Sequence, residues 1–458
     1  MKVTTKTMDD KIELYPFGGS AIVKTKDPDR KIVGGKGLGL QVMSKIGVDV
    51  PPGFTMPTTL CPVYAAHGEI PSEIWNNVEK CIARIEKDMN KKFGDETHPL
   101  LFSVRSGAAI SMPGMMDTVL NIGLNDETVL GLAKATQNPR FAWDAYRRLL
   151  NMFGDVVQGI PHESFEERFS IIKEEADVVN DIDLGVEELK NLCNAYKEVF
   201  KEHDKEFPQC PREQLKACIK AVFGSWNAPR AIKYREINGI KDLIGTAANI
   251  QTMVFGNMGN TSGTGVAFSR NPSTGEHLLY GEYLINAQGE DVVAGIRTPE
   301  HISKMEETMP EAYKIFVENV DKIERHFKDM QDVEFTVENG KLWMLQCRNG
   351  KRTGVAALKI AIDLVNDGIC DKHEAILKVE PDHIKQLLHP NFTAEALDSE
   401  DYKTKVFATG LAGGPGAAVG KIVFTTKKAE ESKEKGESVI LLRECTSPED
   451  VGGMWASA

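Results

Sequence analysis

The chain has 458 residues, with 55 basic and 67 acidic side chains and a net charge of −12. At about 150 residues per domain, this length predicts roughly three domains. With 41% apolar and 27% charged residues, the composition argues against a mainly disordered chain. The acidic balance argues against an electrostatic nucleic-acid binder, and no apolar run approaches the roughly 20 residues that a membrane helix needs.

Residues 1–17 contain no apolar stretch typical of a signal peptide and no Arg-rich amphipathic stretch typical of a transit peptide. The eight cysteines are scattered, and none belongs to a C-x-x-C pair with a matching histidine cluster. We therefore expect reduced thiols, no zinc site and a cytoplasmic location.

A glycine-rich loop is predicted at residues 34–39, just before a helix in which Leu40, Met43 and Ile46 have helical spacing. Backbone N–H groups at a helix start favour a phosphate, and Lys36 adds a positive charge. The pattern is not a Walker A loop, because glycine rather than serine or threonine follows the lysine. Taken alone, it fits a glycine-rich turn with a solvated lysine equally well.

Two further stretches have the chemistry to bind phosphate. A strand-like run over residues 100–105 ends at Arg105, and an arginine at a strand end can hold phosphate through two parallel hydrogen bonds. The alternative for this arginine is a surface ion pair. The loop at residues 259–265 is rich in glycine and hydroxyl groups and can form a nest of amides, or simply a hairpin turn.

The middle of the chain, residues 127–220, is predicted to be helical because charged and apolar residues alternate at three- and four-residue spacing. A helix is also predicted over residues 302–328, and Thr353 could cap another that ends before Gly368. Strands are predicted over residues 249–255, 266–269, 278–284, 333–337, 342–347, 421–425 and 438–442.

The most informative local feature is a predicted hairpin with four polar residues, Asp332, Glu334, Gln346 and Arg348. A two-residue turn pairs Glu334 with Leu345 and puts Gln346 on the opposite face. A three-residue turn with a bulge shifts the register by one, so that all four polar side chains face the same way. In that register, two carboxylates and an amide oxygen converge as ligands for Mg²⁺. The alternative is an ordinary amphipathic hairpin with its polar face in water.

Together these segments resemble one family, pyruvate, phosphate dikinase, over nearly the whole chain. The family's reaction interconverts ATP, phosphate and pyruvate with AMP, diphosphate and phosphoenolpyruvate. The resemblance is carried by residues 34–37, 52–54, 103–107, 111–118, 138–142, 146–148, 225–227, 229–232, 251–257, 261–267, 270–276, 281–295, 329–332, 334–336, 346 and 348–351.

The resemblance implies an α+β fold, in which an ATP-grasp nucleotide-binding domain with a helical insertion precedes a linker and an incomplete phosphohistidine (swivelling) domain. The implied parts are residues 1–120 with 206–250 as the first ATP-grasp subdomain, 121–205 as the helical insertion, 251–352 as the second subdomain with the Mg-ATP hairpin, 353–405 as a helical linker and 406–458 as the start of the phosphohistidine domain.

The resemblance also implies a phosphotransferase that uses ATP and Mg²⁺, with a monovalent cation as a further candidate. Pyruvate would bind only to domains that these residues do not include. The full-length members of the family imply a possible homodimer. No nucleic-acid or membrane partner is expected. The implied roles are phosphate binding and catalysis for Lys36, Arg105 and Arg348, covering of the phosphates for Gly114, Thr261, Ser262, Gly263, Thr264 and Gly265, metal binding for Asp332, Glu334 and Gln346, and a further ATP contact for Asp332.

The chain departs from the family pattern in two places. Ala109 stands where the family usually has an arginine, which removes a possible phosphate contact. The family's phosphorylated histidine lies in a Thr-Ser-His segment that these residues do not contain. Residues 446–450 match the approach to it, but Trp455 replaces the usual histidine beside Met454.

We therefore expect the ATP-binding portion of a dikinase, which passes a phosphoryl group to a carrier histidine absent from this chain. Two alternatives remain open: a catalytically incomplete nucleotide-binding or sensor module, and an enzyme similar to phosphoenolpyruvate synthase that uses water instead of phosphate.

Overall fold

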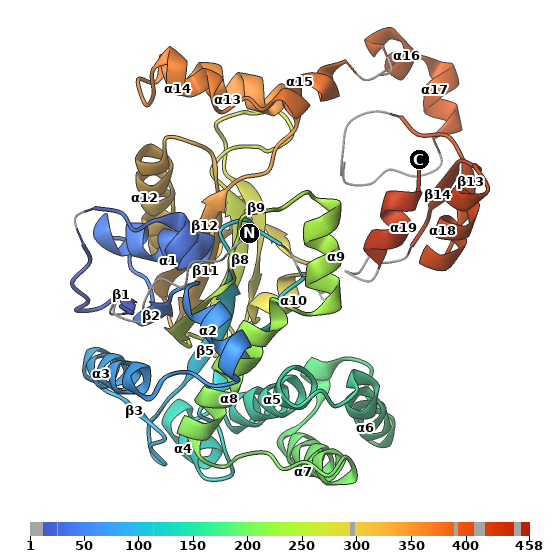
Figure 1. Cartoon of the computed structure of the whole chain (residues 1–458). Coiled ribbons are helices and arrows are strands. Elements are labelled where there is room, and N and C mark those ends of the chain that lie inside the picture. Colours follow the sequence, from blue (N-terminus) through green and yellow to red (C-terminus); the bar gives the residue numbers. More distant parts are fainter. Residues whose placement is uncertain are drawn as a thin grey trace. The chain divides into compact units, whose positions relative to one another are not determined.

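The computed structural model describes most of the chain and contains many helices and strands, which confirms the predicted α+β class (Figure 1). It divides into two compact units. The first unit comprises Met1–Ala267, Gly281–Ile323 and Asp332–Arg348, and the second comprises Phe268–Tyr280, Glu324–Gln331 and Asn349–Ala458. The described residues are 12–24, 26–112, 114–293, 298–388, 393–406, 417–443 and 450–458.

The first sheet of the first unit has five strands, and every pair of neighbours is antiparallel. Its strands, in spatial order, are β1 (Tyr15–Phe17), β2 (Gly53–Met56), β7 (Ala247–Thr252), β5 (Phe102–Gly107) and β6 (Thr118–Ile122). Arg105 lies inside β5, opposite Asn249 on β7 and Thr118 on β6. The prediction that Arg105 ends its strand is therefore wrong, because the strand continues to Gly107.

Helix α1 (Arg30–Lys45) packs against this sheet and contains the glycine-rich stretch. The predicted loop at residues 34–39 is wrong, because only Gly34 leaves helical geometry, with φ of 72°. A Cβ on Gly34 would lie 1.9 Å from the Gly107 carbonyl oxygen, and a Cβ on Gly39 would lie 2.9 Å from that of Cys347. The glycines therefore let the helix approach β5 and the hairpin strand that carries Cys347.

The second sheet contains the predicted hairpin and has the spatial order β10-β9-β8-β11-β12. Helix α12 (Pro310–Phe327) packs on it, with the Phe316 and Phe335 ring centroids 4.5 Å apart. Most of the predicted strands in this region are confirmed within a few residues. The strands are β8 (Gly263–Phe268), β9 (Tyr280–Ile285), β10 (Glu300–His301), β11 (Gln331–Glu338) and β12 (Lys341–Asn349).

The helical character predicted for residues 127–220 is confirmed, and α4 to α7 lie together in the lower part of Figure 1. Phe153, Phe165, Phe200 and Phe207 form part of a buried aromatic core there. The helices are α4 (Thr128–Thr136), α5 (Pro139–Met152), η1 (Phe153–Val157), α6 (His162–Glu175), η2 (Asp181–Asp183), α7 (Val186–Glu202), α8 (Pro211–Ser225) and α9 (Pro229–Ile237).

Several further elements complete the first unit. They are α2 (Leu60–His67), α3 (Ser72–Met89), β3 (Lys92–Phe93), β4 (Pro99–Leu100), α10 (Gly289–Val293), η3 (Ile302–Lys304) and α11 (Met305–Thr308).

In the second unit, the C-terminal part of the chain starts with helix α13 (Gly354–Asn366). Thr353 caps this helix, as predicted, because its hydroxyl accepts a hydrogen bond from the Ala356 N–H. Residues 446–449, most of the stretch that matches the approach to the family's histidine, lie outside the described residues. The later elements are α14 (Lys372–Ile376), α15 (Pro381–Leu387), α16 (Ala394–Asp398), α17 (Glu400–Lys405), β13 (Lys421–Val423), α18 (Thr426–Glu434), β14 (Val439–Leu441) and α19 (Val451–Ala456).

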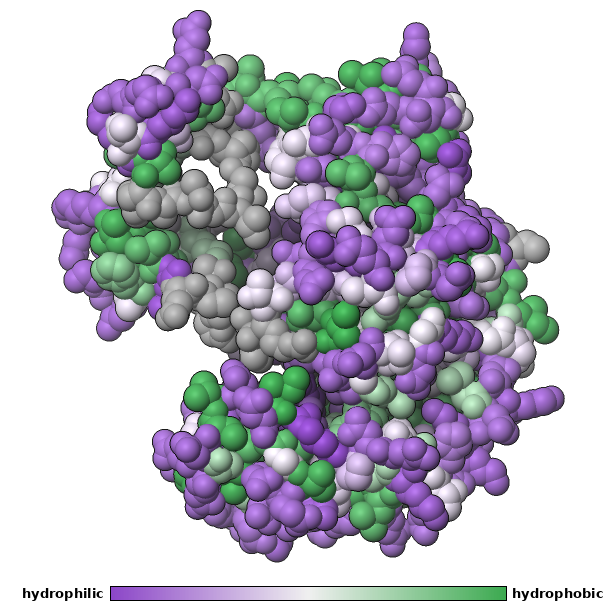
Figure 2. Space-filling model, turned by 180° about the vertical axis from the view of Figure 1, so that it is seen from behind, coloured by the Kyte–Doolittle hydropathy of each residue, from purple (hydrophilic) through white to green (hydrophobic). Residues whose placement is uncertain are grey.

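Hydrophilic side chains dominate the described surface seen in Figure 2, and apolar side chains gather in separate patches. Among the described residues, no helix has both the length and the apolar composition that crossing a membrane requires.

Replacing Gly34 by alanine should lower the free energy of unfolding by about 3 kcal/mol, because alanine disfavours positive φ and its Cβ would collide with Gly107. Gly47 is the matched control, since its φ is 74° but no atom lies within 4 Å of the place that an alanine Cβ would occupy. Gly47→Ala should cost only about 1–2 kcal/mol. Chemical denaturation followed by circular dichroism measures both; equal costs would show that the close approach at Gly34 is unimportant.

Candidate functional site

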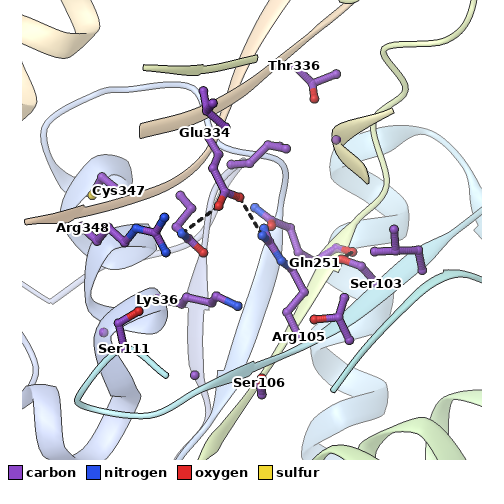
Figure 3. Close-up of a pocket in the computed structure, with 18 of the residues that line it drawn as sticks. Lys36, Ser103, Arg105, Ser106, Ser111, Gln251, Glu334, Thr336, Cys347 and Arg348 are labelled. Carbon is purple, nitrogen blue, oxygen red and sulfur yellow. Dashed lines mark hydrogen bonds and ion pairs between the residues drawn. The ribbon is translucent and has the colours of Figure 1, made fainter. Parts of the chain in front are cut away.

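A cavity of about 610 Å³ lies in the first unit and is lined by strands of both sheets and by the start of α1 (Figure 3). This volume is within the range of small-molecule sites. Much of the lining is apolar, including Met112, Met116, Leu120, Val254 and Val292. The cavity could therefore hold the flat apolar part of a ligand beside a charged part.

The charged part of the lining comes from four separate elements. Lys36 extends from α1, Arg105 from β5, Glu334 from β11 and Arg348 from β12, and Figure 3 shows their side chains directed into one space. The Arg105 guanidinium donates to a Glu334 carboxylate oxygen at 2.8 Å. Residues separated by more than 200 positions in the sequence therefore meet in one polar cluster.

Two side-chain pairs show that the polar residues of the hairpin meet on one face. Gln346 Nε2 donates to Glu334 Oε1 at 3.0 Å, and Arg348 Nε donates to Asp332 Oδ2 at 2.7 Å. Glu334 thus meets Gln346 and Asp332 meets Arg348, which are the pairs that the shifted register predicts.

The turn itself is the two-residue alternative and not the three-residue turn that would give the shifted register. Asn339 and Gly340 both have positive φ, of 48° and 82°, which is typical of a two-residue type I′ turn. Near the open end, however, the Gly350 N–H donates to the Met330 carbonyl oxygen. A regular hairpin with this two-residue turn would pair Met330 with Asn349, whereas the observed bond pairs Met330 with Gly350. A one-residue shift between the turn and the open end reconciles the two observations.

The ionisation of the cluster reflects burial and mutual attraction. Burial disfavours the charged form of Glu334, but Arg105 and Lys36 outweigh it and hold the pKa of this carboxyl below its ordinary value. For Asp332, burial outweighs the attraction of Arg348 and raises the pKa. Burial, with repulsion from Arg105, lowers the pKa of Lys36 to about 7.

The donor set fits a magnesium ion that shares its coordination with phosphate. The side-chain oxygen Oε1 of Gln346 is buried without a hydrogen-bond partner, next to the Glu334 carboxylate. An unpartnered buried oxygen is costly unless something binds it. Within the described ranges, no group of three or more His, Cys, Asp or Glu side chains could hold a metal alone. This agrees with Mg²⁺, which usually binds one or two carboxylates and completes its shell with phosphates and water.

Most predicted site residues line the cavity, and four do not. Those in the lining are Lys36, Arg105, Gly114, Thr264, Gly265, Glu334, Gln346 and Arg348. Asp332 is outside the lining but pairs with Arg348. Thr261, Ser262 and Gly263 are also outside it. The Ser262 hydroxyl is fully buried and accepts a hydrogen bond from the Asn339 N–H, so this stretch packs against the hairpin turn instead.

Some lining residues had no predicted role, namely Arg30, Ser103, Ser106, Ser111, Gln251 and Thr336. The sequence pattern could have identified Thr336, because its two-residue spacing from Glu334 and Asp332 puts it on the same face of the strand. No local pattern identified Arg30 or Ser103. Ala109 is buried and lies outside the lining.

Comparison with known proteins shows the family to which the chain belongs. The family model described as pyruvate phosphate dikinase, AMP/ATP-binding domain, matches residues 66–320 and 311–367, which is more than half of the chain. The chain belongs to the pyruvate, phosphate dikinase family. β5 and the hairpin lie inside the segment matched by the model for AMP and ATP binding, whereas α1 precedes that segment.

The dikinases of three plants show the extent of the similarity. The chain is 57% identical over 430 residues to the chloroplastic pyruvate, phosphate dikinase of Mesembryanthemum crystallinum, 56% over 430 to chloroplastic dikinase 1 of Arabidopsis thaliana, and 55% over 431 to dikinase 2 of Zea mays. These matches cover 93–94% of this chain and 44–48% of the relatives. The chain therefore spans about half the length of the curated relatives it matches. A cytoplasmic location stays a prediction.

Nucleotide binding should be linked to protonation of Lys36. With a pKa of about 7, most of this lysine is neutral at pH 8, whereas a bound phosphate chain favours the ammonium form. Binding of Mg-ATP at pH 8 should therefore take up close to one proton, and affinity should fall as pH rises above 7. Calorimetry in buffers of different ionisation enthalpy measures the uptake. Lys36→Arg, which stays charged, controls for protonation of the nucleotide itself; equal uptake in both proteins would contradict the prediction.

Gln346→Leu should separate metal binding from folding. Without ligand, the change removes both a hydrogen bond to Glu334 and a costly unpartnered oxygen, so the free energy of unfolding should change by less than about 1 kcal/mol. The gain in ATP affinity on adding Mg²⁺ should fall about tenfold or more. Titration of ATP with and without Mg²⁺ gives this gain; an unchanged gain would remove Gln346 from the metal site.

Proposed function

We propose that this cavity binds Mg-ATP and transfers a phosphoryl group from it to the imidazole of a carrier histidine. In the complete reaction, ATP, phosphate and pyruvate would yield AMP, diphosphate and phosphoenolpyruvate. The observation that carries the proposal is the meeting of Lys36, Arg105, Glu334, Gln346 and Arg348 in one cavity whose lining is largely apolar. The membership of the chain in the dikinase family supports it.

The arrangement suits a reaction that depends on positioning and charge rather than on a protein nucleophile. The apolar walls would hold the adenine, while Lys36, Arg105 and Arg348 would contact phosphate oxygens. Glu334, Gln346 and, beyond the lining, Asp332 would hold Mg²⁺. When bound, the ion would neutralise the charge that develops on the phosphate oxygens. Gly114, Thr264 and Gly265 would lie against the phosphate chain.

The rest of the implied architecture belongs to the same proposal. Two sheets that both line one cavity support an ATP-grasp domain with residues 1–120 and 206–250 on one side and 251–352 on the other. Residues 121–205 would be its helical insertion, and a linker at 353–405 would lead to the start of a phosphohistidine domain at 406–458. The homodimer and the monovalent cation, which the resemblance to the family implies, stay predictions.

The decisive experiment mixes the purified chain with labelled ATP and a carrier domain that contains the Thr-Ser-His segment. We expect Mg²⁺-dependent label on the carrier histidine. Glu334→Gln keeps the shape of the side chain but removes its charge. It should lower the rate of label transfer at least about 100-fold, because it weakens metal binding and removes the ion pair with Arg105. Circular dichroism checks that this variant folds.

Three outcomes have different meanings. Label on the carrier histidine supports phosphoryl transfer. Binding of Mg-ATP without any transfer to the carrier would instead show a nucleotide-binding or sensor module. Failure to bind Mg-ATP at all would overturn the assignment of the cavity.

A further inference from the structure

The start of α1 brings one more cation to the cavity, Arg30, which has no predicted role. Arg30 is solvent-exposed yet belongs to the cavity lining together with Gly35 and Lys36. A Cβ on Gly35 would lie 3.4 Å from Arg30 Nη2 and 3.7 Å from its Nε. The guanidinium therefore lies over the bare backbone of Gly35, at the solvent-facing edge of the cavity.

The cations of the cavity fall into two classes. Arg105 and Arg348 are each held by a carboxylate, Glu334 at 2.8 Å and Asp332 at 2.7 Å. Arg30, in contrast, makes no hydrogen bond or ion pair with any residue that the structure describes. Its five donor N–H groups are thus available to an anion without the loss of a protein contact.

The charges of the lining favour an anion beside Arg30. The lining contains four basic residues, Arg30, Lys36, Arg105 and Arg348, against a single acidic one, Glu334. At the start of α1, the carboxylate of the N-cap residue Asp29 already accepts a hydrogen bond from the Lys31 N–H, so the helix terminus adds little attraction for a second anion. A bound phosphate would relieve the mutual repulsion of the cations in the lining.

We propose that Arg30 binds a phosphate group at the open edge of the cavity. The ligand is either the terminal phosphate of the bound nucleotide or a free phosphate ion, and the planar guanidinium would hold two of its oxygens. This inference rests on the proposed function, because it adds a residue to the same phosphate-binding site.

The test compares Arg30→Gln with Lys31→Gln in the full chain. Lys31 is the matched control, because it is the adjacent exposed cation on the same helix turn but does not line the cavity. Calorimetry gives the affinity of each protein for Mg-ATP, for AMP, and for inorganic phosphate in the presence of AMP. Arg30→Lys, which keeps the charge but loses the paired donors, is the conservative variant. Thermal unfolding confirms that all the variants fold.

If Arg30 holds the terminal phosphate, Arg30→Gln should weaken Mg-ATP binding about tenfold and change AMP binding by less than about twofold. If it holds a free phosphate, Mg-ATP binding should be unchanged and phosphate binding should weaken about tenfold. In either case Lys31→Gln should have little effect, and Arg30→Lys should recover part of the affinity.

Three results would overturn the inference: equal losses in Arg30→Gln and Lys31→Gln, equal losses for AMP and Mg-ATP, or no loss for any ligand. Each of these results assumes a wild-type chain that binds Mg-ATP. It would therefore reject the role of Arg30 in phosphate binding without contradicting the proposed function. If the wild-type chain itself does not bind Mg-ATP, the proposed function fails, and the role of Arg30 fails with it.

Discussion

The ion pair between Arg105 and Glu334 is the contact on which the site depends, because it joins a central strand of one sheet to the hairpin of the other. Both side chains are largely shielded from water, so each would be costly to bury without the other. A buried pair of this kind adds little net stability compared with apolar residues of the same shape. Its value lies in keeping one cation and one carboxylate close together in a cavity that would otherwise repel either charge.

The glycines of α1 determine how close the third charged element can come. Gly34 and Gly39 bring the helix against Gly107 and Cys347 at distances that any side chain would prevent. The helix can then direct Lys36 into the cavity, where burial lowers its pKa. The predicted amide loop is not needed for this role. The Gly35 N–H already donates to the Ala108 carbonyl oxygen, so the side chain rather than a free backbone nest provides the positive charge.

Local patterns in the sequence predicted most of the hairpin, the helical stretch and the Thr353 cap, because each depends on residues close together in the chain. The length of β5 was not predictable in this way, since it depends on pairing with β7, almost 150 residues later. The same holds for Ser262, whose glycine-rich neighbourhood resembles a phosphate loop. Only the folded chain shows that its hydroxyl is already engaged by the Asn339 N–H.

The hairpin shows why the proposed metal site depends on both the sequence pattern and the folded structure. Alternation along two strands identified the polar residues, but a two-residue turn alone would put Gln346 on the wrong face. The one-residue shift inferred between the turn and the open end accounts for the contact between Gln346 and Glu334. Gln346 Oε1 is buried there without a partner. Meanwhile each oxygen of Glu334 accepts one hydrogen bond, from Arg105 or from Gln346. In the proposed site, a polyanion that attracts Arg105 would free one carboxylate oxygen of Glu334 for a cation, so the proposed binding of phosphate and of the metal would reinforce each other.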